Sequence, residues 1–115
     1  MHSRFFADPP GAPQIQGLNK DDVLTAGRMK RVTCVSIGGN PLASLRWFRG
    51  DEELEARYIT QDNYASAEVA FIPFNSDNGG DLRCEAVNSA AAEHPLVASM
   101  TLTVNYPPEI VKMSI

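Results

Sequence analysis

The sequence contains few cysteines and histidines, and this scarcity limits the metal chemistry that it could support. Its 115 residues include only Cys34, Cys84, His2 and His94 of these two types. A structural zinc site needs four ligands at suitable spacing, and no C-x-x-C or H-x-x-x-H pair is present. The acidic stretch at 51–55 lacks the spaced oxygen ligands and the central glycine of a calcium loop. We therefore expect neither a metal ion nor any other cofactor.

Long apolar runs and clustered positive charge are also missing. No apolar run approaches the roughly 20 residues that span a bilayer. The formal net charge of −4 is spread along the chain without the basic stripe that binding to a phosphate backbone requires. The short apolar stretch at 5–7 is too small for a secretion signal. We expect no nucleic-acid partner and no membrane contact by this segment, so that any signal or membrane-spanning segment lies outside it.

Motifs for catalysis are absent as well. His94 precedes Pro95, and no Gly-x-Ser-x-Gly elbow or comparable nucleophile motif accompanies it. Gly79 and Gly80 precede a strand-like run, whereas a phosphate-binding glycine loop opens a helix, so this pair is interpreted as a turn. We expect the protein not to be an enzyme and to take no small-molecule substrate.

Turn-forming residues recur at short, regular intervals along the chain. They occupy positions 9–13, 26–27, 38–41, 50–51, 61–63, 75–80 and 107–108. The runs between them alternate apolar and polar residues, which is typical of an all-β sandwich or barrel. No sustained helical apolar face and no internal repeat is found.

Alternation assigns an inward and an outward face to each run. The inward residues are Val32 and Cys34; Leu45 and Trp47; Val69 and Phe71; Leu82, Cys84 and Ala86; and Met100, Leu102 and Val104. Five apolar faces need one shared interior, which two sheets packed face to face supply. The outward positions of the same runs then include Arg46, Phe48, Arg83, Glu85, Thr101 and Thr103. The predicted fold is an antiparallel two-sheet sandwich.

The spacing of three inward residues resembles the immunoglobulin superfamily. Trp47 follows Cys34 by 47 − 34 = 13 residues, and Cys84 follows Cys34 by 84 − 34 = 50. The resemblance covers about residues 13–106 and implies that Cys34 and Cys84 form a disulfide between the sheets, with the Trp47 indole packed on it. It places Trp47 and Leu82 in the core. Closing a loop of this length contributes about 4 kcal/mol in the chain-entropy model and implies an oxidising compartment.

Local segments extend the resemblance. "WFRGDEEL" (47–54) resembles the C strand and following turn of many constant-2 or intermediate-set domains, and "DNGGDLRCEAVN" (77–88) resembles the turn into strand F. "PPGAPQIQGL" (9–18) and "LTVNYPPEI" (102–110) are most similar to the joints between consecutive constant-2-like domains of nephrin-like cell-adhesion receptors. These receptors carry long immunoglobulin arrays that bind related receptors on neighbouring cells, in kidney filtration, muscle and synapse formation. One departure is Leu82, which stands where most members carry a tyrosine that ties the corner before the second cysteine. The corner is expected to depend on the turn at 77–80 and on apolar packing.

The resemblance also implies a domain organisation and a role. Residues 1–12 are expected to be a linker or leading remnant, 13–106 the immunoglobulin domain, and 107–115 a linker with the start of a following domain. The module would be an extracellular spacer or scaffold in a single-pass plasma-membrane receptor, with related immunoglobulin receptors recognised through other domains of the same chain. Two alternatives remain: a direct ligand-binding domain of another cell-surface receptor, and an intracellular muscle-type domain with free thiols.

Phe48 is the candidate centre of a protein interface. If Trp47 points inward, Phe48 points outward, where Arg46, Arg83 and Glu85 would surround it. An aromatic residue among arginines is typical of interface centres. The alternative is structural, because single exposed phenylalanines are common and Arg46 opposite Glu85 could form an ordinary cross-strand ion pair.

Overall fold

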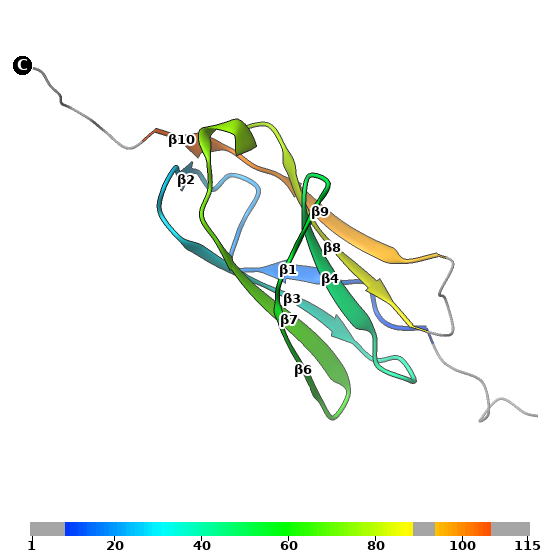
Figure 1. The fold of residues 1–115 in the computed structure, drawn as a ribbon. Coiled ribbons are helices and arrows are strands. Elements are labelled where there is room, and N and C mark those ends of the chain that lie inside the picture. Colours follow the sequence, from blue (N-terminus) through cyan, green and yellow to red (C-terminus); the bar gives the residue numbers. More distant parts are fainter. Residues whose placement is uncertain (1–8, 89–93, 107–115) are drawn as a thin grey trace, which may run out of the picture.

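The computed structural model describes residues 9–88 and 94–106 and consists of two four-stranded antiparallel sheets packed face to face (Figure 1). One sheet has the order β1 (Gln14–Gln16), β3 (Lys30–Ile37), β7 (Tyr64–Phe71) and β6 (Arg57–Gln61). The other has the order β5 (Glu52–Leu54), β4 (Ser44–Arg49), β8 (Asp81–Val87) and β9 (Leu96–Thr101). β2 (Leu24–Thr25) pairs in parallel with β10 (Val104–Asn105), and a short 3₁₀ turn, η2, spans Asn75–Asp77. The predicted immunoglobulin-like sandwich is confirmed.

The alternation of the sequence explains which faces are buried. Within β3, Val32, Cys34 and Ser36 are buried while their neighbours are more exposed, and β8 repeats this pattern at its own even-numbered positions. Side chains of a strand alternate between its two faces, so each strand contributes one row to the interior. The predicted parity of these strands is confirmed.

The two sheets are joined at one level by a covalent bond and a hydrogen bond. Cys34 of β3 and Cys84 of β8 form the disulfide, as the resemblance implied. Trp47 lies directly opposite Cys84 in the pairing of β4 with β8, and its Nε1–H donates to the carbonyl oxygen of Ala67 at 2.9 Å. Ala67 is itself paired with Cys34 across β3 and β7. The fully buried indole therefore bridges the sheets beside the disulfide, with its only donor satisfied.

The last strand predicted from the sequence is split in two. β9 pairs with β8 only as far as Thr101, opposite Asp81. The segment before Asp81 is a turn rather than a strand. Leu102 therefore exchanges backbone hydrogen bonds with Gly79 and Gly80 of this turn, both at 2.8 Å. The chain then pairs with β2 in β10. Leu102 and Val104 are both buried, so the apolar alternation continues through the break. The sequence pattern therefore did not show that the strand is split.

The corner that lacks the usual tyrosine is held by the turn itself. Leu82 occupies the tyrosine position and is 0% exposed. The side-chain oxygen Oδ1 of Asn78 accepts a hydrogen bond from the backbone N–H of Val104 at 2.9 Å. Gly79 adopts a φ of 85°, a conformation that glycine accepts without strain. The amide of Asn78 thus fixes β10 to the turn that precedes Leu82.

A second fastening is Arg49, at the end of β4. Its guanidinium donates to the carbonyl oxygen of Ile72 at 3.0 Å and lies 3.6 Å from Oδ2 of Asp77. Its Cζ is 5.1 Å from the ring centroid of Phe74 and 5.8 Å from that of Phe71. Only 15% of the arginine side chain is exposed. Arg49 therefore ties one sheet to the segment that leaves the other.

The chain enters and leaves the sandwich at opposite ends (Figure 1). Near its start, Gly11 donates its backbone N–H to the carbonyl oxygen of Ile37, the last residue of β3, at 2.9 Å, and accepts from the Ser36 hydroxyl at 2.8 Å. The other end is reached by β10, next to β2 and the turn that leads into the first residue of β3. Eight residues of β3 separate the two ends by about 26 Å. Within residues 9–88 and 94–106, no helix is both long and apolar enough to span a bilayer.

Candidate functional site

The predicted surface residues lie together on the outer face of the second sheet. Phe48 of β4 is paired with Arg83 on β8 and with Glu53 on β5. Arg46 lies opposite Glu85, one outward position further along the same two strands. These five residues, Arg46, Phe48, Glu53, Arg83 and Glu85, are called the Phe48 face below. Glu53 was not selected from the sequence, because the alternation does not fix how the short strand β5 aligns with β4.

Two arginines contact the ring of Phe48. The Cζ atom of Arg83 lies 4.5 Å from the ring centroid, and that of Arg46 lies 5.3 Å from it. Both distances are within the range of a cation–π attraction. Phe48 is half-buried rather than fully exposed. The ring is thus partly covered by the alkyl and guanidinium groups of its own neighbours.

The charges of the Phe48 face are paired with one another. Arg46 binds Glu53 through two contacts, Nη2 to Oε1 at 2.7 Å and Nε to Oε2 at 3.1 Å. Arg83 donates from Nε to Oε2 of Glu85 at 3.1 Å and from Nη1 to the carbonyl oxygen of Gly50 at 3.0 Å. Arg46 therefore bonds Glu53 rather than Glu85, its opposite residue, because Arg83 occupies the Glu85 carboxylate. Two positive and two negative side chains leave the face without an excess of either sign.

The pairing of Arg46 with Glu53 shifts both titrations. The hydrogen bond from Arg46 lowers the pKa of the Glu53 carboxyl, partial burial opposes this shift, and the positive charge of Arg46 adds to the lowering. The same hydrogen bond raises the pKa of Arg46. Both groups are at the surface, so salt screens the pair and it contributes little to overall stability.

The substitution Arg46→Met is expected to raise the pKa of Glu53 toward its ordinary value of 4.5. A carboxyl whose folded-state pKa is depressed contributes stability that is present above its unfolded pKa and is lost as the pH falls through the folded pKa. The variant should therefore lose less stability than the parent below pH 4.5. Side-chain carboxyl NMR titration measures the shift directly. Arg57→Met on β6 is the control, and an unchanged Glu53 pKa in Arg46→Met would contradict the assignment.

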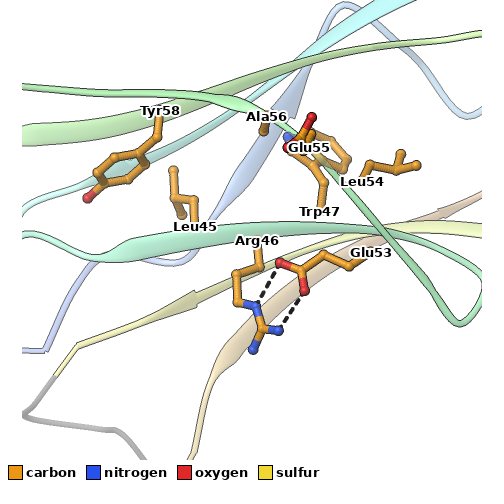
Figure 2. A pocket seen from close by; sticks show the side chains of 8 residues that line it. All are labelled: Leu45, Arg46, Trp47, Glu53, Leu54, Glu55, Ala56 and Tyr58. Atoms are coloured by element: carbon orange, nitrogen blue, oxygen red, sulfur yellow. Dashed lines mark hydrogen bonds and ion pairs between the residues drawn. The ribbon is translucent and has the colours of Figure 1, made fainter.

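A groove of about 390 Å³ lies beside the Phe48 face, between the edge strand β5 of one sheet and the edge strand β6 of the other (Figure 2). Its lining residues are Leu45, Arg46, Trp47, Glu53, Leu54, Glu55, Ala56 and Tyr58. The hydroxyl of Tyr58 donates to the carbonyl oxygen of Ala43, and burial raises the pKa of Tyr58. The lining contains no serine, cysteine or histidine that could act as a nucleophile with a base beside it.

The other predicted residues belong to the interior. Cys34 and Cys84 are both 0% exposed and bonded to each other, so neither sulfur is free. Trp47 and Leu82 are also 0% exposed. Among the described residues, no group of three or more histidines, cysteines or carboxylates is arranged to hold a metal ion.

Comparison with known proteins identifies relatives of the chain. The family described as CD80-like C2-set immunoglobulin domain matches residues 13–95. Nephrin from Homo sapiens is 36% identical over 110 residues, which cover 90% of this chain and 8% of nephrin. Cell adhesion molecule 2 from Homo sapiens is 27% identical over 108 residues, which cover 88% of this chain and 24% of that protein. The chain thus spans a small part of each relative.

A solved structure has the same fold over most of the chain. The full ectodomain of mouse nectin-like molecule 4, with domains Ig1 to Ig3, superposes with a TM-score of 0.73 at 27% sequence identity. The match covers 85% of this chain and 35% of the ectodomain. The chain belongs to the CD80-like C2-set immunoglobulin domain family, and it is an immunoglobulin module related to nephrin and to nectin-like adhesion receptors.

Proposed function

We propose that this chain is an extracellular spacer module in the array of a nephrin-like adhesion receptor. The observation that carries the proposal is that the chain enters at one end of a disulfide-locked sandwich and leaves at the other. Such a module adds a fixed length between its neighbours in an array. Residues 13–106 form the module, 1–12 lead into it, and 107–115 link it to the start of a following domain. Recognition of related immunoglobulin receptors on neighbouring cells then falls mainly to other domains of the receptor.

The internal pairing of the Phe48 face supports a spacer more than a binding surface. A partner would have to displace or share the carboxylates that already satisfy Arg46 and Arg83. Desolvating paired charges without better partners costs free energy. The ring of Phe48 is also partly covered by the same arginines. These contacts favour a structural role for the face.

The disulfide supports the extracellular setting. Structural disulfides persist in oxidising compartments, and an intracellular muscle-type domain would keep Cys34 and Cys84 as thiols. The related nectin-like structure is itself described as an ectodomain. A role in adhesion as part of a single-pass plasma-membrane receptor, without enzymatic activity, is consistent with these relatives.

The test compares variants of the full receptor in a cell-aggregation assay. A Phe48→Ala, Arg83→Glu double variant should aggregate cells as the parent does, because the face is not used for recognition. Deleting the module should weaken aggregation, and an unrelated immunoglobulin domain of equal length in its place should restore it.

A second candidate is direct ligand binding by the Phe48 face. The observation in its favour is an aromatic ring held between two arginines at the middle of a sheet. It predicts that the double variant abolishes aggregation while remaining folded, and that the replacement domain fails to restore it. Either result would overturn the spacer proposal.

A further inference from the structure

Several of the large apolar side chains that stay exposed lie at the end where the chain leaves the sandwich. They are Met29 (59% exposed), Ile72 (44%), Phe74 (54%) and Tyr106 (71%). These four residues are called the exit-end surface below. They come from three segments far apart in the sequence: the turn before β3, the segment after β7, and the residue after β10.

Backbone hydrogen bonds hold these three segments side by side. Ala26 donates its N–H to the carbonyl oxygen of Asn105 at 2.9 Å, next to Tyr106. Gly27 donates to the carbonyl oxygen of Pro73 at 2.9 Å. The turn at 26–29 therefore lies between the other two segments, at the end of the molecule where β2, β10 and η2 meet (Figure 1).

The exit-end surface is presented by a fixed backbone. Pro73 is fully buried, so Ile72 and Phe74, on either side of it in extended chain, project away from the core. The backbone N–H of Phe74 donates to Oδ2 of Asp77 at 2.7 Å. Arg49 binds the Ile72 carbonyl and lies under the Phe74 ring. The Phe74 ring is therefore supported by the Arg49 guanidinium.

We propose that the exit-end surface is the seat on which the following immunoglobulin domain of the receptor packs, fixing the angle between the two modules. This inference rests on the proposed function. Single exposed apolar residues are ordinary, whereas a group of them held on one rigid end indicates a surface that is covered in the assembled protein. Burying them against a neighbour removes apolar area from water.

The course of the chain and the relatives favour the following domain as the occupant of this surface. β10 delivers the chain to this surface at Tyr106, the last residue that the structure describes, and the sequence continues with Pro107 and Pro108. Any domain attached there is held close to the surface at a high effective concentration, which a free partner would have to overcome. The related ectodomain contains three immunoglobulin domains, of which this chain matches about one.

The positive charge beside the exit-end surface predicts a negative charge on the domain that packs there. Arg28, adjacent to Met29, is exposed and forms no ion pair within residues 9–88 and 94–106. A matching surface would combine apolar side chains with a carboxylate near Arg28. Charge complementarity of this kind sets orientation more than affinity.

Hydroxyl-radical footprinting of side chains tests the proposal. The labelling rates of Met29, Phe74 and Tyr106 are measured in the 115-residue chain and in the complete ectodomain. We expect these rates to fall by about fivefold in the ectodomain, as for half-exposed side chains that become buried. Tyr58 on β6, which is 45% exposed and away from this end, should label equally in both proteins.

A variant of the ectodomain gives the second arm. In Ile72→Ser, Phe74→Ser, the labelling of Met29 and Tyr106 should return to the rate in the 115-residue chain. The matched control is Ile37→Ser, Ile59→Ser, which alters two exposed residues of the first sheet and should keep both protected. Unfolding curves of both variants confirm that the domain remains folded.

Equal labelling of the three residues in the 115-residue chain and in the ectodomain would show that no domain packs on the exit-end surface, and would refute the proposal. Protection that persists in the Ile72→Ser, Phe74→Ser variant would overturn it as well. Neither result depends on the aggregation assay, which tests the spacer role separately. Conversely, lost aggregation in the Phe48 and Arg83 variant would refute the spacer role while leaving the footprint of the exit end intact.

Discussion

Replacing both cysteines, Cys34→Ala and Cys84→Ala together, is expected to lower the free energy of unfolding by about 4 kcal/mol. The bond closes a loop with a sequence separation of 50 residues, so its removal restores much conformational freedom to the unfolded chain. Small domains have a net stability of about 5 to 15 kcal/mol, so this loss is a large share. Both residues are changed so that no free thiol is left. Urea unfolding followed by tryptophan fluorescence measures the difference.

Reduction of the parent provides the control for this experiment. The parent unfolded in the presence of a thiol reductant should have the stability of the double variant, since neither contains the cross-link. The variant itself should not respond to reductant. A loss below about 1 kcal/mol would mean that the cross-link does little to restrict the unfolded chain, contrary to the chain-entropy account.

The substitution Trp47→Phe is expected to lower the free energy of unfolding by about 2 to 4 kcal/mol. It removes the Nε1–H donor and leaves the carbonyl oxygen of Ala67 buried without that partner. It also leaves a void beside the disulfide, because the smaller ring cannot fill the space of an indole that is 0% exposed. Denaturant unfolding of the oxidised protein, followed by far-ultraviolet circular dichroism, measures the loss.

The neighbouring residue provides the matched control. Phe48→Leu changes an aromatic side chain of the same strand that points outward, and it should cost less than about 1 kcal/mol. The difference between adjacent positions depends entirely on the direction in which each side chain points. If the two variants were equally destabilised, the buried hydrogen bond to Ala67 would carry no particular weight.

The sequence was most informative where a local rule decides the outcome. Alternation alone separates the buried row of β8 from its half-buried outward row, and so places Leu82 in the core and Arg83 on the outer face. The same rule brings Phe48 and Arg83 onto one face, because both occupy outward positions of strands that become neighbours. These features need no knowledge of distances between atoms.

Features that depend on how separate segments meet were missed. Arg49 continues the inward parity of Leu45 and Trp47, so the pattern offered a signal: a charged residue at a buried position needs a partner. One carboxylate partner, Glu52 at 3.1 Å, is local in the sequence, whereas the other, Asp77 at 3.6 Å, lies in a turn whose position follows only from the packing of both sheets. Glu53 likewise depends on the alignment of β5 across the turn at 50–51. The exit-end surface requires three such segments to be placed at once.

The parallel pairing of β10 with β2 also determines how the module carries tension. A pull on the two ends of the sandwich drives these strands past each other, so that Leu24–Thr103 and Ala26–Asn105, bonded at 2.8 and 2.9 Å, are sheared together rather than opened one by one. After these strands separate, the disulfide still prevents the 50-residue loop from stretching. The extended length of the unfolded chain is therefore shorter by about 170 Å. Only the residues outside that loop can then extend under tension.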